Sequence, residues 1–186
     1  MSQDFLTNQF LVAMPTMDDP NFRETVTYIC EHSEQGALGI IINRPMNVVL
    51  EDVLKQLALK AEDSDTAASP VYLGGPVQTE RGFVIHEPMG EWEATLKVTD
   101  SIGVTTSRDI LEALAAGGGP RRCVVALGYA GWTAGQLEEE VKGNAWLTVP
   151  ADSRIIFDTP PELRWQSAAK LLGVDMTLLS GDAGHA

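Results

Sequence analysis

Short apolar runs that end at proline, glycine or acidic residues recur along this chain of 186 residues, and they constrain its fold more than any other feature. β-branched and aromatic side chains are frequent in these runs, which is typical of strands. We expect strands at residues 9–14, 25–30, 37–43, 71–73, 83–86, 123–127, 146–149 and 155–157, and one or two more within 92–104. The tight connection at 33–36 predicts a hairpin between the second and third of them.

Four other stretches have apolar residues at helical spacing behind a capping residue. They are 47–57, the stretch from Ser107 to the glycines at 117–119, 133–143 and 159–173. Asn47 and Ser107 are the expected caps of the first two, and Thr133 and Thr159 open capping boxes. Because these helices do not alternate regularly with the strands, we predict an α+β fold, a compact arrangement of mixed, coiled β-sheets flanked by about four helices. One domain spanning 1–186 is expected, with an exposed acidic linker at about 60–69.

Acidic residues outnumber basic ones by 26 to 13, which gives a formal net charge of −13. This charge argues against direct nucleic-acid binding and against docking on an anionic membrane. The sequence contains no run of about 18 apolar residues, so we expect no membrane-spanning segment. Residues 1–5 lack the pattern of a secretory signal, so we expect a cytoplasmic protein. The acids are concentrated in 1–69, with 11 acids and 4 bases, whereas 70–126 has 7 and 5, so a small anionic ligand is compatible with the charge.

The two cysteines, Cys30 and Cys123, form no C-x-x-C pair. Reduced thiols are expected in the cytoplasm, where free cysteine usually acts as a small buried hydrophobe. A reactive thiol would need nearby cations that lower its pKa, and Arg121 and Arg122 beside Cys123 are the only sequence hint of that.

Nine segments occur in an order that is specific for one family. In chain order they are 10–15, 19–22, Gly39-Ile40-Ile41-Ile42-Asn43-Arg44-Pro45, Gly74-Gly75-Pro76-Val77, 81–86, Leu127-Gly128-Tyr129-Ala130-Gly131-Trp132, 135–138, 144–147 and 183–186. With them the chain closely resembles the bacterial YqgE/AlgH family over nearly its whole length. The resemblance implies a compact α+β fold of bifurcated, coiled sheets flanked by helices, and a cytosolic bacterial protein. The AlgH name attaches to a proposed transcriptional regulator of alginate production, and the family has no established catalytic residues to carry over.

Three residues at strand ends could contribute to a ligand site. The guanidinium of Arg44 could bind a carboxylate or phosphate, or could equally hold loop carbonyls of the fold. Gly75 could bring backbone N–H groups close to an anion, although its motif is not a P-loop and fits a tight structural turn. His86 suits proton transfer near neutral pH, but no nucleophile or orienting acid can be placed beside it, which favours a structural role.

Tyr129 and Trp132 complete the set of candidate ligand-binding residues. We expect them in a glycine-containing segment between a strand and the start of a capped helix, where free N–H groups favour anions. The two rings could wall an apolar pocket, and the alternative is that they close the core beneath a turn.

No nucleophile elbow or H-E-x-x-H motif is present, and the three histidines, His32, His86 and His185, do not have metal-ligand spacing. We therefore predict no catalytic residue, no metal and no cofactor. The favoured function is a cytosolic regulator, associated with alginate or transcription, that acts through an unknown protein or small-molecule partner rather than through direct DNA binding. The alternatives are a small-molecule-binding protein or enzyme with a site at converging strand ends, and a DNA-binding transcriptional regulator.

Overall fold

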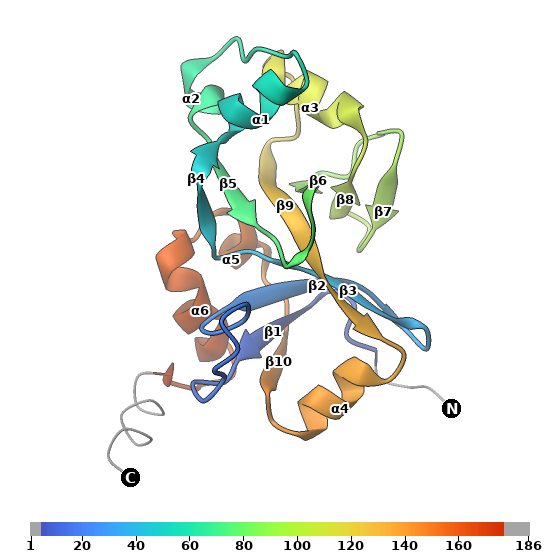
Figure 1. The fold of residues 1–186 in the computed structure, drawn as a ribbon, viewed down its shortest axis with the longest axis vertical. Helices are drawn as coiled ribbons and strands as arrows, with labels where there is room; N and C mark the ends of the chain where they lie inside the picture. The colour runs from blue at the N-terminus through green and yellow to red at the C-terminus, as the bar shows by residue number, and fades with distance from the viewer. Residues whose placement is uncertain (1–4, 177–186) are drawn as a thin grey trace.

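The structure, a computed structural model, describes residues 5–176. Within this range the chain forms ten strands and six helices (Figure 1). The strands are β1 (Gln9–Ala13), β2 (Val26–Ser33), β3 (Gly36–Ile41), β4 (Pro45–Val49), β5 (Pro70–Leu73), β6 (Val77–Glu87), β7 (Thr95–Lys97), β8 (Gly103–Thr105), β9 (Arg122–Thr133) and β10 (Trp146–Pro150). The helices are α1 (Leu50–Gln56), α2 (Ser64–Ala67), α3 (Arg108–Ala115), α4 (Gln136–Lys142), α5 (Ser153–Phe157) and α6 (Pro161–Lys170). The predicted α+β class is confirmed.

Strand β9 belongs to two groups of strands at once. Its C-terminal part pairs with β3, which continues the order β10-β1-β2-β3, and its N-terminal part pairs with β6, which leads to β8 and β7. β5 lies parallel to β9 and also pairs with β4, whereas the other described pairings are antiparallel. Gly128 lies between the two parts with a φ of 80°, a conformation that glycine adopts without strain, and it bends the strand without ending it. In Figure 1, β9 therefore runs from the end of the molecule that holds α1–α3 toward α4.

A close crossing of backbone segments lies where the two groups of strands diverge. Directly after β5, Gly74 donates its N–H to the carbonyl of Leu127, and its own carbonyl accepts the N–H of Ile41, both at 2.8 Å. A Cβ added at Gly75 would fall closer than 3.0 Å to the backbone of Tyr129, a separation that real Cβ atoms essentially never show. Only a residue without a side chain fits at this crossing, because the obstacle is backbone and not a movable side chain.

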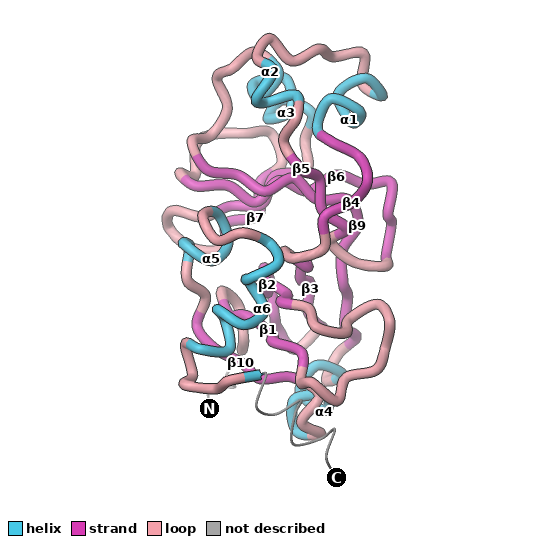
Figure 2. The backbone as a smooth tube through the Cα atoms, turned by 90° about the vertical axis from the view of Figure 1, so that its left-hand side faces the viewer, coloured by secondary structure: helices cyan, strands magenta, loops and turns pink. Residues whose placement is uncertain are grey.

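Apolar side chains form three buried clusters. The largest joins β1, β2, β3, β6 and β9 with α5 and α6. The second lies under α1 and α3 against β5, β6 and β9, and the third lies under α4 against β1, β9 and β10. Figure 2 shows the corresponding helices from the side, with α1–α3 at one end, α4 at the other, and α5 and α6 along one face. Burial of apolar area beneath each helix stabilises the curled sheet.

The expected strand at 155–157 is wrong, because these residues form helix α5. Asp152 caps this helix, and its side chain accepts the N–H of Arg154 at 2.9 Å. Ile155 and Ile156 are both buried, and a run of three apolar residues has no periodicity that separates a strand from a helix. With α5 and the short α2, the described chain has six helices instead of about four.

The expected caps of α1 and α4 are also wrong. Asn47 lies within β4, a strand that the sequence does not indicate, and Val49 precedes α1. Gly135 precedes α4, because β9 extends through Thr133, although Gln136 does accept the N–H of Thr133 at 3.0 Å as the capping-box pattern predicts.

Ser107 holds the predicted cap position of α3, but its hydroxyl donates to Asp109 instead of accepting a backbone N–H of the helix. The expected cap Thr159 is wrong, because Pro160 precedes α6.

His86 links β6 to β7 and β8 through hydrogen bonds whose direction is set by chemistry. Its Nδ1 lies 3.0 Å from the carbonyl oxygen of Pro88, which can only accept, so Nδ1 carries the proton of the neutral ring. Nε2 lies 2.7 Å from Oγ1 of Thr105 and accepts a hydrogen bond from that hydroxyl group. Oγ1 of Thr105 in turn accepts a hydrogen bond from the hydroxyl group of Thr95, also at 2.7 Å. The ring is fully buried beside Trp92. Burial lowers the pKa of His86 below its usual 6.5.

Replacing Gly75 with alanine should destabilise the fold, because the new Cβ meets the backbone of β9. We expect a loss of about 3 kcal/mol or more in the free energy of unfolding, measured by urea titration. Gly82→Ala is the matched control, since a Cβ at Gly82 has nothing within 4 Å. Equal losses for the two variants would contradict the importance of the crossing.

The lowered pKa of His86 predicts a pH dependence of stability. As the pH falls, His86 of the unfolded chain binds a proton at a higher pH than His86 of the folded chain. The contribution of the neutral ring to the free energy of unfolding is therefore full above about pH 6.5 and decreases below it. The slope for one proton is at most about 1.4 kcal/mol per pH unit. Urea unfolding between about pH 8 and about pH 5 should therefore show a flatter curve for His86→Gln than for the unaltered protein, and parallel curves would refute this role.

Candidate functional site

The predicted ligand-binding residues do not converge on one cavity. Arg44 lies before β4, and its two Nη atoms donate to the carbonyls of Pro20 (2.7 Å), Asn21 (2.9 Å) and Arg23 (2.8 Å). These bonds hold the loop that precedes β2 and occupy both ends of the guanidinium. Arg44 lines none of the three cavities described below.

Gly75 and His86 also lie outside these three cavities. Gly75 is at the backbone crossing beside β9, where there is no space for a side chain. His86 is fully buried within the hydrogen-bond chain that joins β6 to β8. Neither residue is therefore placed to contact a ligand in these cavities.

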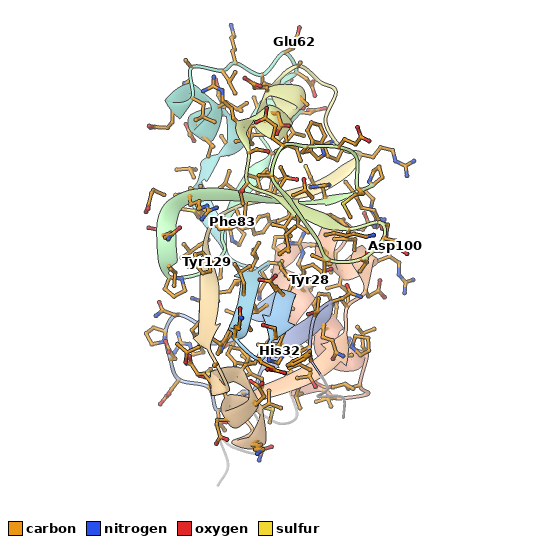
Figure 3. The ribbon with its side chains drawn as sticks, turned by 90° about the vertical axis from the view of Figure 1, so that its right-hand side faces the viewer. Tyr28, His32, Glu62, Phe83, Asp100 and Tyr129 are labelled. Carbon is orange, nitrogen blue, oxygen red and sulfur yellow. The ribbon has the colours of Figure 1, made fainter. Side chains whose placement is uncertain are left out.

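Tyr129 and Trp132 lie within β9, so their expected position between a strand and a helix start is wrong. Tyr129 packs edge-on against Phe83, with ring centroids 5.6 Å apart (Figure 3). Trp132 is 7% exposed and donates its Nε1–H to Glu140 at 2.9 Å. Both line an open hollow of about 440 Å³ beside the β2–β3 hairpin. The structure thus brings these two residues together and separates them from the other three.

The largest of the three cavities lies between α1, α3 and the sheet of β6, β8 and β9, and we call it the α1–α3 groove. Its volume is about 470 Å³. Its lining residues are Val48, Asp52, Val53, Gln56, Leu57, Glu80, Gly82, Val84, Thr105, Thr106, Ser107, Arg108, Leu111, Val125 and Leu127. A hollow of this size with a mostly apolar wall is typical of small-molecule sites.

Local sequence explains why the groove stays open. α1 and α3 each direct apolar side chains at the sheet, among them Val53 and Leu111. Between them β6 presents Gly82, where a Cβ would meet nothing within 4 Å. The missing side chain leaves space that the flanking residue Val84, 2% exposed, does not fill. A glycine that is open on one face is therefore part of the floor of this cavity.

Charged groups of the groove lie among its exposed residues. Arg108 is already paired, since Nε donates to Glu112 at 3.1 Å and Nη2 donates to the carbonyl of Leu57 at 2.7 Å. Asp52 accepts the N–H of Val49 at 2.9 Å. The side chain of Glu80 makes no hydrogen bond or ion pair with any residue of the described chain. The available charge of the groove is therefore negative.

Reactive groups are poorly placed for chemistry. Thr105 lines the groove and donates to His86, which resembles a nucleophile and its base, but Thr105 is fully buried. Burial raises the pKa of Cys123 to about 11 and raises that of Cys30 as well, so both thiols are protonated at neutral pH. Within residues 5–176 no three His, Cys, Asp or Glu side chains are grouped to hold a metal ion, and His185 lies outside the described residues. Burial thus leaves the Thr105 hydroxyl enclosed and the two thiols protonated.

The residues of the groove were not anticipated from the sequence. The apolar faces of α1 and α3 were visible as helical spacing, but spacing does not separate a residue that faces a cavity from one that faces the core. Gly82 gave the clearest missed signal, because a glycine in a strand often marks a place where something approaches the backbone.

Comparisons with known proteins agree along the whole chain. A family model described as AlgH-like matches residues 10–177. A UPF0301 protein of Thioalkalivibrio sulfidiphilus is 59% identical over 180 residues, which cover 97% of this chain and 96% of the relative. The solution structure of the AlgH protein from Pseudomonas aeruginosa is similar, with a TM-score of 0.81 and 51% identity over 100% of this chain and 98% of that one.

A crystal structure of a protein from Corynebacterium diphtheriae has a TM-score of 0.72 at 18% identity, and it covers 97% of this chain and 94% of that one. At this identity the likeness concerns the fold alone. The match of the family model and the identity to the bacterial relatives extend further, to the sequence motifs as well as the fold. On this evidence the chain belongs to the AlgH-like family.

Proposed function

We propose that this protein is a cytoplasmic regulator that binds a small molecule in the α1–α3 groove and does not contact DNA directly. The observation that carries the proposal is the groove itself, a mostly apolar hollow of about 470 Å³ whose charged groups are exposed. A ligand with an apolar body would displace water from Val53, Leu111 and Val125. The resemblance to AlgH, a proposed regulator, supports the regulatory role.

Charge complementarity specifies the head group of this ligand. Glu80 has no partner in the described chain, and Asp52 adds a second carboxylate to the lining. Arg108, the one cation of the lining, already has Glu112 and a backbone carbonyl as partners. An anionic head would meet uncompensated like charge, so the ligand has a neutral or cationic head.

The net charge of −13 argues against the alternative of direct DNA binding. No helix of the described chain is long and apolar enough to cross a membrane. Together with the buried Thr105 and the protonated thiols, the charge leaves a binding role as the function that the geometry supports best.

Filling the groove at Gly82 tests the ligand site. Gly82→Leu should abolish binding of Nile red, an uncharged apolar dye, because the new side chain enters open space in the groove. Gly118→Leu is the matched control, since its Cβ also meets almost nothing and the residue lies outside the groove. Fluorescence titration measures both variants, and thermal unfolding checks that both remain folded. Unchanged dye binding by Gly82→Leu would show that the dye does not bind in the α1–α3 groove.

Displacement of the bound dye tests the head group. Octylammonium should displace Nile red at lower concentration than octanoate, and Glu80→Gln should reduce this difference because it removes the unpaired carboxylate. Equal competition by the two ions, or stronger competition by octanoate, would contradict the predicted preference.

Gel-shift measurements in about 0.1 M salt test the exclusion of DNA. A protein with 26 acids and 13 bases should give no sequence-selective retardation of duplex DNA at this ionic strength. Selective binding that weakens steeply with salt would show that the regulator acts on DNA itself.

A further inference from the structure

The third cavity, which we call the Arg164 cavity, lies between the strands β5 and β9, the helix α2 and the pair α5–α6. Its volume is about 340 Å³. Among its lining residues are Tyr72, Arg121, Cys123, Val125, Phe157 and Arg164. This lining contains two arginines and no carboxylate, in a protein whose formal charge is −13.

Arg164 is a buried cation without an acidic partner. Its residue is 4% exposed, and within the described residues no carboxylate lies at ion-pair distance from it. Its Nε donates to the carbonyl of Thr159 at 2.8 Å, Nη1 donates to the carbonyl of Ile42, and the guanidinium lies 5.1 Å from the ring centroid of Tyr72. Burial of a charge is costly unless an opposite charge compensates it. Neutral carbonyls and a ring orient Arg164, and Glu162 stabilises its charge only from beyond ion-pair distance, so burial still lowers the pKa of Arg164.

Arg121 contributes a second available cation to the same lining. Its side chain is exposed, and it makes no hydrogen bond or ion pair with the described part of the chain. The adjacent Arg122 differs, because it pairs with Glu87 at 2.7 Å and with Asp158. The cavity therefore has one buried and one exposed guanidinium, and among the described residues neither has a carboxylate within ion-pair distance.

The remaining wall suits a flat apolar body. Tyr72 is 4% exposed, and Phe157 lies under the guanidinium of Arg122 at 5.1 Å from the ring centroid. The thiol of Cys123 also lines the cavity, and because burial raises its pKa to about 11 it is neutral there and does not repel an anion.

From this lining we propose that the Arg164 cavity binds a small phosphate monoester with a flat apolar body. The phosphate contacts Arg121 and Arg164, which offer planar N–H donors suited to its oxygens. The body packs against Tyr72 and Phe157. This site goes beyond the function proposed for the α1–α3 groove, since it is a separate cavity with the opposite charge, although Val125 lines both.

NMR titration of the ¹⁵N-labelled protein with phenyl phosphate tests the site. We expect saturable shifts of amides at Thr66, Val124 and neighbouring residues of the lining. Phenol at the same concentration and sodium chloride at the same ionic strength should give no saturable shifts there. Inorganic phosphate should bind more weakly than phenyl phosphate, because it lacks the apolar body, and an equal affinity would refute the role of the two rings.

Arg121→Gln should weaken phenyl phosphate binding by about tenfold, as expected for the loss of one charge-assisted contact. Arg81→Gln is the matched control, because it removes the same charge from an exposed arginine that lies over Phe83 and outside the cavity. Arg164→Lys should weaken binding further where thermal unfolding shows that the variant is folded. Equal affinities of the Arg121 and Arg81 variants, or no saturable shifts in the unaltered protein, would overturn the proposal.

Gly82→Leu separates the two sites. It should leave phenyl phosphate binding unchanged, since Gly82 lines only the α1–α3 groove among the two cavities. Loss of phenyl phosphate binding in this variant would place the anion in the groove and refute the assignment to the Arg164 cavity. Loss of Nile red binding alone would concern only the groove.

Discussion

The bend of β9 at Gly128 is the constraint on which the rest of the fold depends. A single strand pairs with β3 after the bend and with β5 and β6 before it, so both groups of strands share one backbone. The bend is held from outside by the segment at Gly74 and Gly75, which bonds to β9 and β3 and approaches Tyr129 without side chains. Two glycine segments that are far apart in the chain thus act as one structural unit.

Both candidate cavities follow from this arrangement. The part of β9 before the bend is covered by α1 and α3 on one side and approached by α5 and α6 on the other, and Val125 lines both the α1–α3 groove and the Arg164 cavity. The α1–α3 groove exposes the unpaired carboxylate of Glu80, whereas the Arg164 cavity is lined by Arg121 and Arg164. The formal charge of −13 therefore bears on which large partners the whole surface can bind, but it does not determine the charge of the ligand that a single cavity accepts.

The sequence predicts the fold class because the described strands other than β4 contain local runs of apolar and β-branched residues. It failed where the outcome depends on distant partners. The glycines around Tyr129 suggested a turn, and only pairing with β3 and β6 keeps this segment in β9. The sequence is compatible with Arg44 as a ligand contact or as a residue that holds a loop, and the three carbonyls that it binds lie more than twenty residues earlier in the chain. Gly82 could not be assigned to a cavity, because the helices that enclose it come from other parts of the sequence.

Burial restricts the chemistry that is open to the reactive side chains of this molecule. His86, Thr105 and Cys123 are the residue types that an active site would use, but each is withdrawn from solvent or bonded to the fold. The lowered pKa of His86 and the raised pKa of Cys123 both have desolvation as their first cause, which is the mark of an apolar interior and not of a neighbouring charge. Among the charged side chains that line the α1–α3 groove and the Arg164 cavity, Glu80 and Arg121 are the exposed ones without a partner in the described residues. Accessible charge beside an apolar wall determines which ligands a cavity can accept, and both proposed sites rest on this combination.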